Sequence, residues 1–216
     1  MAFARKETLA VSLLRGAFFH AAGMGNVFDC RPKQYPVLFA GLHNSGKTQA
    51  LYSLMPDASP AVSPTMAFNL ETVVVDNAKL QITDTGGNDK WVRPLGKHFW
   101  QGQKAVVFFV DSSDVERIGD AGKSVAEAAG TAQAQGQTAA GLLRQHLAAP
   151  EFEGAIFLIL ANKQDVEGCC SVEEVQRRMG MDSARQQWHI QGCSAVTGQG
   201  LADGMSWLVE RLATVP

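Results

Sequence analysis

The sequence contains few cysteines, and they follow no metal-binding or disulfide pattern. Its four cysteines, Cys30, Cys169, Cys170 and Cys193, form neither a Cys-x-x-Cys pair nor the Cys/His spacing of a zinc site. Small secreted domains that depend on disulfides carry a denser and more regular set of cysteines. We therefore expect no structural disulfides, no zinc site, and a reducing, cytoplasmic environment.

Long apolar runs and a strong excess of one charge are also absent. We find no run of about 18 apolar residues that would cross a bilayer. The N-terminus lacks the continuous apolar core and cleavage site of a secretory signal. A formal net charge of −2 gives no electrostatic reason to expect nucleic acid as a partner. These absences argue against membrane-spanning, secreted and nucleic-acid-binding proteins.

The sequence does contain short apolar runs that alternate with helix-like patterns. Hydrophobic residues make up 46% of the chain, which suits a globular domain. Six runs predict strands, at residues 35–41, 70–76, 79–84, 105–111, 155–161 and 188–193. Helices are expected after Gly46 and around residues 113–129, 138–148, 171–179 and 200–213. This alternation predicts an α/β fold with a mostly parallel six-stranded sheet and helices on both faces.

Two stretches depart from this plan. Residues 1–31 precede the first predicted strand and form an N-terminal extension to the domain at 32–216. Within 119–141, Ala, Gly and Gln dominate and large apolar side chains are almost absent, which predicts an exposed insertion. This insertion is either a functional loop or tolerated surface decoration, and the composition favours decoration.

Residues 41–48 read GLHNSGKT and match the pattern GxxxxGK[ST] between a predicted strand and a predicted helix. Successive backbone N–H groups of such a loop converge on phosphate oxygens at the positive end of a helix. Lys47 adds a charge for the β- and γ-phosphates, and the Thr48 hydroxyl is a hard oxygen ligand for Mg²⁺. The segment therefore predicts a phosphate-binding loop.

Residues 161–165 read ANKQD and end a very apolar predicted strand, where ligands bind in open parallel sheets. The Asp165 carboxylate can accept hydrogen bonds from the N1–H and 2-amino groups of guanine, an edge that adenine lacks. We expect Asn162 to tie loops together and Lys163 to lie along the purine. Near Ala195, in the later segment GCSAVTGQGL, a free backbone N–H would approach the guanine carbonyl oxygen.

Together these motifs, in order and spacing, resemble the Arf and Arf-like (ADP-ribosylation factor-like) branch of Ras-superfamily small GTPases. The resemblance runs from about Met24 to the C-terminus. It includes a first switch around Thr65 and a second switch, DTGG, around Gly87. It implies the P-loop NTPase (small G-protein) fold and a GTP-binding domain at 32–216. It also implies a GTP/GDP switch in membrane traffic, served by an exchange factor, an activating protein and effector proteins.

The resemblance also assigns residues. It implies Mg²⁺ ligands at Thr48 and Thr65 and an effector surface at Phe68 and Phe99. Catalysis would fall to Lys47, Thr65, Gly87 and Asn88. The expected nucleotide contacts come from both switches, the phosphate loop and the base-binding segments: Gly41, His43, Asn44, Ser45, Gly46, Lys47, Thr48, Gln49, Thr65, Asp84, Gly87, Asn162, Lys163, Asp165, Ser194 and Ala195.

Some positions depart from the family pattern. Asn88 stands where a glutamine usually orients the attacking water, which predicts slow GTP hydrolysis and leaves open a non-hydrolysing GTP-binding scaffold. His43 replaces a small or acidic residue and is either functional or a solvated loop histidine. A small-molecule kinase on the same loop is disfavoured, because the base-binding motif is present and an arginine-rich lid is absent.

The N-terminal extension carries an amphipathic pattern. Apolar side chains between Leu9 and Phe18 fall on one helical face, with basic residues elsewhere. Such a helix either packs on the core or makes a reversible contact with an intracellular membrane. Gly25 could accept a myristoyl group only if Met24 were the true start, and Cys30 would then offer a second acylation site.

Overall fold

The computed structural model describes residues 33–55, 68–85, 99–120 and 138–215. The chain divides into two units, Met1–Arg31 and Pro32–Pro216, and every described residue belongs to the second. The predicted amphipathic helix of the extension lies outside the described residues. So do two predicted site segments, around Thr65 and around Gly87–Asn88.

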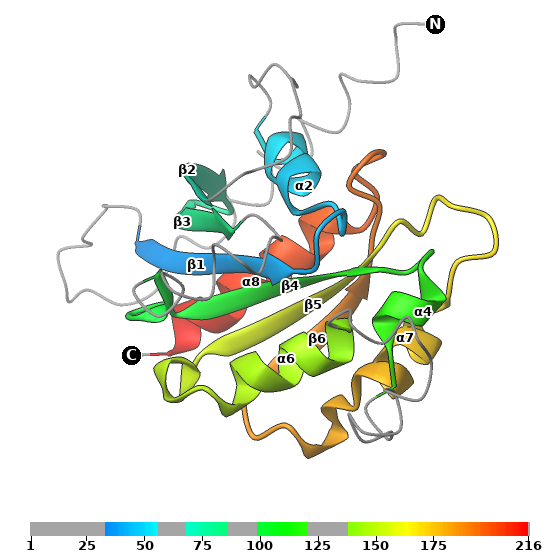
Figure 1. The fold of residues 1–216 in the computed structure, drawn as a ribbon. Helices are drawn as coiled ribbons and strands as arrows, with labels where there is room; N and C mark the ends of the chain where they lie inside the picture. Colours follow the sequence, from blue (N-terminus) through cyan, green and yellow to red (C-terminus); the bar gives the residue numbers. More distant parts are fainter. Residues whose placement is uncertain (1–32, 56–67, 86–98, 121–137, 216) are drawn as a thin grey trace, which may run out of the picture. The chain divides into compact units, whose positions relative to one another are not determined.

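A six-stranded sheet forms the centre of the described unit (Figure 1). In chain order its strands are β1 Gln34–Gly41, β2 Phe68–Val75, β3 Ala78–Thr85, β4 Ala105–Asp111, β5 Ile156–Asn162 and β6 Trp188–Gly192. Their spatial order is β2-β3-β1-β4-β5-β6, and only the β2–β3 pair is antiparallel. The predicted fold class, a mostly parallel sheet with helices on both faces, is confirmed.

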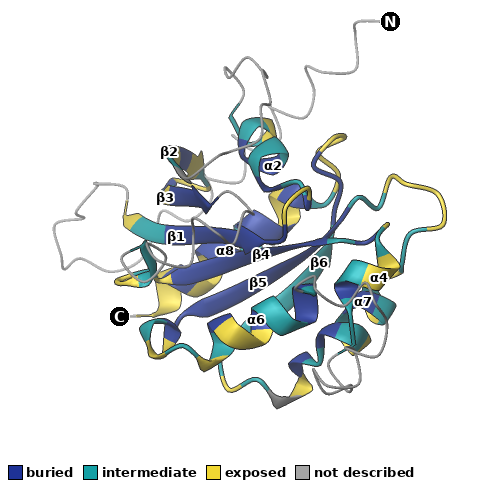
Figure 2. Cartoon of the chain, in the orientation of Figure 1, coloured by how far each residue is buried: buried dark blue, intermediate teal, exposed yellow. Residues whose placement is uncertain are grey.

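Helices cover the two faces of the sheet with separate apolar clusters. On one face lie α2 Lys47–Ser53 and α8 Leu201–Thr214, packed against residues such as Phe39 and Leu160. The other face is covered by α4 Val115–Ile118, α6 Ala139–Ala148 and α7 Val172–Met179. Two short 3-10 helices, Pro150–Phe152 and Met181–Ser183, complete the described elements. Figure 2 shows that β4 and β5, two inner strands of the sheet, are almost wholly buried.

Side-chain caps and turn residues explain several element boundaries. The Thr138 hydroxyl accepts a hydrogen bond from the Gly141 N–H and begins α6, and Ser171 does the same for Glu174 at α7. Between β2 and β3, Asp76 and Asn77 both have positive φ, of 46° and 65°. Two such residues make the tight turn whose twist suits a hairpin, so the β2–β3 hairpin follows from local chemistry.

The prediction of a helix over 113–129 is wrong at residues 119 and 120, which the structure describes as non-helical. There α4 stops, because Gly119 leaves helical geometry with φ 78° and ψ −165°. The predicted insertion also ends too late, since Ala139 and Ala140 belong to α6 and are 3% and 0% exposed. Alanine carries too little apolar surface to stand out in a sequence, yet it allows a helix to approach a sheet closely.

Parallel strands place their carboxyl ends on one edge of the sheet, and this edge carries the predicted motifs. Gly41 ends β1, Asp111 ends β4 and Asn162 ends β5, while Asp84 lies near the end of β3. The order of the strands brings these ends together, although they are far apart in sequence. The fold thereby assembles one polar site.

Candidate functional site

The phosphate loop connects β1 to α2 with glycines at both ends. Gly41 has φ 135°, and a Cβ there would collide with the Phe109 carbonyl oxygen of β4. Gly46 has φ 93°, and a Cβ there would collide with the Asn162 side-chain amide. Both positions need glycine because other strands and loops approach the backbone closely and because the backbone is left-handed. The loop therefore packs closely against both β4 and the end of β5.

Lys47, the first residue of α2, is only 6% exposed. Its ammonium donates to the carbonyl oxygens of Gly41 and Leu42, at 3.0 and 2.9 Å. A buried cation needs such polar partners, since an isolated charge is costly to desolvate. The lysine is thus held across the loop, where the predicted β- and γ-phosphates would lie.

Thr48 and Asp84 bring two hard oxygen atoms together. The Thr48 hydroxyl donates to Asp84 Oδ2 at 2.6 Å, and Asp84 is fully buried at the end of β3. A hydroxyl beside a carboxylate suits Mg²⁺, which prefers oxygen ligands and keeps several waters. These two residues fit the implied ion, whereas Thr65, the other predicted ligand, lies outside the described residues. The described residues contain no cluster of three His, Cys, Asp or Glu side chains for a metal.

Asn162 is 1% exposed and cross-links three segments. Its amide group donates to the Ser45 carbonyl of the phosphate loop at 2.8 Å. Its Oδ1 atom accepts from the Ala195 N–H at 2.8 Å. The asparagine therefore joins the phosphate loop, the end of β5 and the loop after β6.

The same contact fixes the loop in which a backbone N–H near Ala195 is expected to approach a base. The Ala195 N–H itself donates to Asn162. Neighbouring Ser194, 1% exposed, accepts the Thr197 N–H on its hydroxyl. The Ala195 carbonyl accepts from Ser53 Oγ at 2.5 Å, which ties this loop to α2. Both residues thus lie at the predicted site with scaffolding contacts of their own.

Lys163 has a positive φ of 67° and forms an ion pair with Asp111 at 2.6 Å. Burial raises the pKa of Asp111, but hydrogen bonds from Lys163 and Ser113 outweigh burial and hold the pKa below its ordinary value. Sequence reasoning missed Asp111 as a partner. The available signal was its position at the end of the apolar run 105–111, whereas its register with Asn162 is specified only by the sheet.

Asp165 is exposed, in contrast to its neighbour Asn162. Gln164 between them turns inward, and its amide nitrogen donates to Ser112 Oγ and the Cys170 carbonyl at 3.0 and 3.1 Å. Burial raises the pKa of the nearby Cys193 thiol to about 12, with a smaller contribution from the Asp165 charge. An anchored loop therefore presents the Asp165 carboxylate to solvent.

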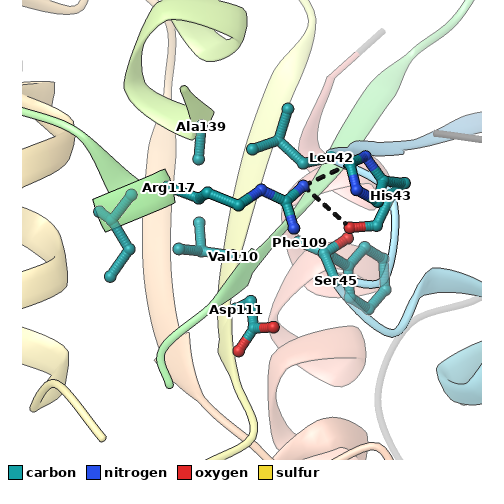
Figure 3. A pocket seen from close by; sticks show the side chains of 9 residues that line it. Leu42, His43, Ser45, Phe109, Val110, Asp111, Arg117 and Ala139 are labelled. Carbon is teal, nitrogen blue, oxygen red and sulfur yellow. Dashed lines mark hydrogen bonds between the residues drawn. The ribbon is translucent and has the colours of Figure 1, made fainter. Parts of the chain in front are cut away.

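Arg117 was also missed from the sequence. Figure 3 shows its guanidinium reaching from α4 to the phosphate loop, where it donates to His43 Nδ1 at 3.2 Å and to the His43 carbonyl at 3.1 Å. His43 is exposed, but it is not merely a solvated loop residue, since it receives this arginine. The sequence shows only a helix cap at Asp114 followed by a cation at Arg117, and the contact with His43 depends on the pairing of β1 and β4.

The remaining predicted residues lie as follows. Asn44, exposed, and half-buried Gln49 belong to the phosphate loop and α2. Phe99 is half-buried, and Phe68 begins β2, although the position of its side chain is not described. Thr65, Gly87 and Asn88 lie outside the described residues. The structure thus brings the phosphate loop and Asp84 together with the segments at Asn162–Asp165 and Ser194–Ala195, here called the base side, on one edge of the sheet.

A phosphate loop after β1 and the NKQD segment after β5 place the chain in the class of P-loop nucleotide-binding proteins. The model of the ADP-ribosylation factor family matches residues 24–212, so the chain belongs to this family of GTP-binding switch proteins. The predicted family is confirmed. The fold is also that of the small GTPase Arl6 (BBS3) from Trypanosoma brucei, solved with the bound nucleotide analogue GppNp. That match has a TM-score of 0.68 and 24% identity, and covers 84% of this chain and 98% of that chain.

Proposed function

We propose that this protein binds GTP and GDP with Mg²⁺ and hydrolyses GTP slowly, so that its two nucleotide states present different surfaces to partners. The observation that carries the proposal is that Asn162 joins the phosphate loop to the end of β5 and the loop after β6, while the nearby Asp165 is exposed. Two charged hydrogen bonds from guanine to that carboxylate would each contribute roughly 1.5–3 kcal/mol. Adenine cannot make them.

Each residue at the edge of the sheet has a role in this proposal. Lys47, now bound to two loop carbonyls, would share its donors with the β- and γ-phosphates. Thr48 and Asp84 would hold the Mg²⁺, which neutralises charge that develops on the phosphates. Asn88 would orient the attacking water, and its short side chain would do so poorly. A misplacement of about 1 Å can cost on the order of 10²-fold in rate.

The cellular part of the proposal rests on family membership. We propose that an exchange factor and an activating protein control the switch, and that effectors in membrane traffic contact Phe68 and Phe99. The protein would act in the cytoplasm and contact an intracellular membrane reversibly through residues 1–31. None of the described helices has the length and apolar character needed to cross a bilayer. Flotation with liposomes, with and without residues 1–22, tests the membrane contact in both nucleotide states.

Competition binding with GTP, ATP and XTP tests the central proposal. We expect GTP to bind far more tightly than ATP, and equal affinities would contradict guanine recognition. A single-turnover measurement of phosphate release then separates a slow hydrolase from a non-hydrolysing scaffold, the alternative that Asn88 leaves open. Release that is undetectable both alone and with an activating protein would support the scaffold.

A further inference from the structure

The side chain of Arg117 lies outside the phosphate loop and binds it at His43. One guanidinium nitrogen donates to both the ring and the carbonyl of His43. Because arginine only donates, His43 Nδ1 must accept, so the ring proton lies on Nε2. Arg117 therefore specifies both the backbone position and the tautomer of His43.

The arginine is itself well oriented. Asp114 caps α4 by accepting the Arg117 N–H at 3.2 Å, and its other oxygen lies 3.6 Å from the guanidinium. Arg117 lines a small cavity, and Figure 3 shows its side chain extending to His43 among the other lining residues. Leu42, Val110, Ile118 and Ala139 contribute to the walls of that cavity. This arrangement connects the end of β4, through α4, to the phosphate loop.

Three successive carbonyl groups of the loop are bound by cations. Lys47 holds those of Gly41 and Leu42, and Arg117 holds that of His43. A peptide unit is planar, and its C=O and N–H point in opposite directions. Fixing the His43 carbonyl therefore fixes the direction of the Asn44 N–H, in a residue whose φ of 62° lies in the left-handed region.

We propose that Arg117 is a positioning residue of the phosphate loop, which acts through His43 to keep the loop's N–H groups aimed at bound phosphate. The proposal rests on the proposed nucleotide binding. It makes α4 a second point of control over nucleotide release, because any partner that moves α4 moves Arg117. In this arrangement Lys47 would contact the phosphates directly, whereas Arg117 contacts the loop at His43 and so acts on the phosphates through the loop.

Dissociation of a fluorescent GDP analogue from the full-length protein tests this role. Loss of two charge-assisted hydrogen bonds in Arg117→Ala should speed release roughly tenfold. Arg117→Lys, which retains the charge with one point of contact, should fall between that variant and the wild type. His43→Ala removes only the ring contact, so its release rate should lie between those of the wild type and Arg117→Ala. Arg185→Ala removes an exposed arginine beyond the opposite edge of the sheet, so it is the matched control and should not change release.

Amide hydrogen exchange gives a second readout that needs no nucleotide. In Arg117→Ala, exchange should rise at residues 42–46 and stay unchanged in β4 and β5. A uniform rise across the sheet would mean that Arg117 is only structural and would overturn the proposal. Release at the wild-type rate, with unchanged exchange in the loop, would also overturn it. If the wild type binds no guanine nucleotide, the proposed function fails, while exchange at residues 42–46 still decides the role of Arg117.

Discussion

Asn162 on the base side of the site and Lys47 on its phosphate side are both buried polar side chains, yet they bind different kinds of partner. Asn162 contacts Ser45 and Ala195, which are 117 and 33 residues away in sequence. Lys47 contacts carbonyls only five and six residues before it. Asn162 therefore cross-links separate loops, whereas Lys47 closes a local turn.

This difference separates scaffolding from recognition. On the base side, Asn162 organises the loops, and a different residue, exposed Asp165, would recognise the ligand. On the phosphate side, the same lysine that closes the loop would also contact the phosphates. We therefore expect base-side variants to affect either stability or specificity, and phosphate-side variants to affect both binding and turnover.

The largest expected effect is on base preference. In Asp165→Asn, the two hydrogen bonds from guanine to the carboxylate are lost, so GTP affinity should fall by on the order of 10²–10⁴-fold. The new amide can donate to the 2-oxo group of xanthine, so XTP should gain affinity relative to GTP. Competition binding measures both changes. Because Asp165 is exposed, the melting temperature without nucleotide should not change, and a marked fall would break the separation of recognition from scaffolding.

The next effect concerns the cross-link itself. Asn162→Ala leaves the Ser45 carbonyl and the Ala195 N–H buried without partners, and each such group costs about 1–3 kcal/mol. We expect a loss of about 2–4 kcal/mol in the free energy of unfolding, measured with urea. Affinity should fall for GTP and XTP alike, since no base contact is altered.

Gln164→Ala is the matched control for Asn162→Ala. This variant also removes an amide that bridges two segments. The Gln164 side chain is only half-buried, however, so water can replace it as the partner of those segments. We expect a smaller loss of stability than in Asn162→Ala. Equal losses would show that Asn162 has no special role in joining the loops.

Parts of this design could be predicted from the sequence and others could not. The strands β4 and β5 are continuous apolar runs, and GLHNSGKT and NKQD carry their chemistry within a few residues, so local patterns were sufficient. The contacts of Arg117 with His43, and of Lys163 with Asp111, join residues 74 and 52 positions apart. Such pairs depend on strand order and register, which a single sequence does not specify.

A smaller effect is expected on the phosphate side, at the position of the attacking water. Asn88→Gln adds one methylene and restores the reach of the usual glutamine, so bound GTP should be hydrolysed at least severalfold faster. GDP affinity should not change, because the side chain would lie beyond the diphosphate. Single-turnover phosphate release measures the rate. Identical rates in the two proteins, alone and with an activating protein, would mean that residue 88 does not position the water.

The smallest effect is the pH dependence of the Lys163–Asp111 pair. The pKa of Asp111 in the folded protein lies below its ordinary value of 3.8. The pair therefore stabilises the fold fully above the ordinary pKa, and this contribution is lost as the pH falls through the lower pKa of the folded state. After allowance for solvent screening, Asp111→Asn should cost about 0.5–1 kcal/mol at pH 7. The difference from the wild type should shrink on acidification, because the wild-type carboxylate then takes up its proton. Urea unfolding at neutral and acid pH measures this trend, with Glu210→Gln as a control that removes an exposed carboxylate from α8. If the difference between Asp111→Asn and wild type stays constant with pH, the ion pair does not support the base side.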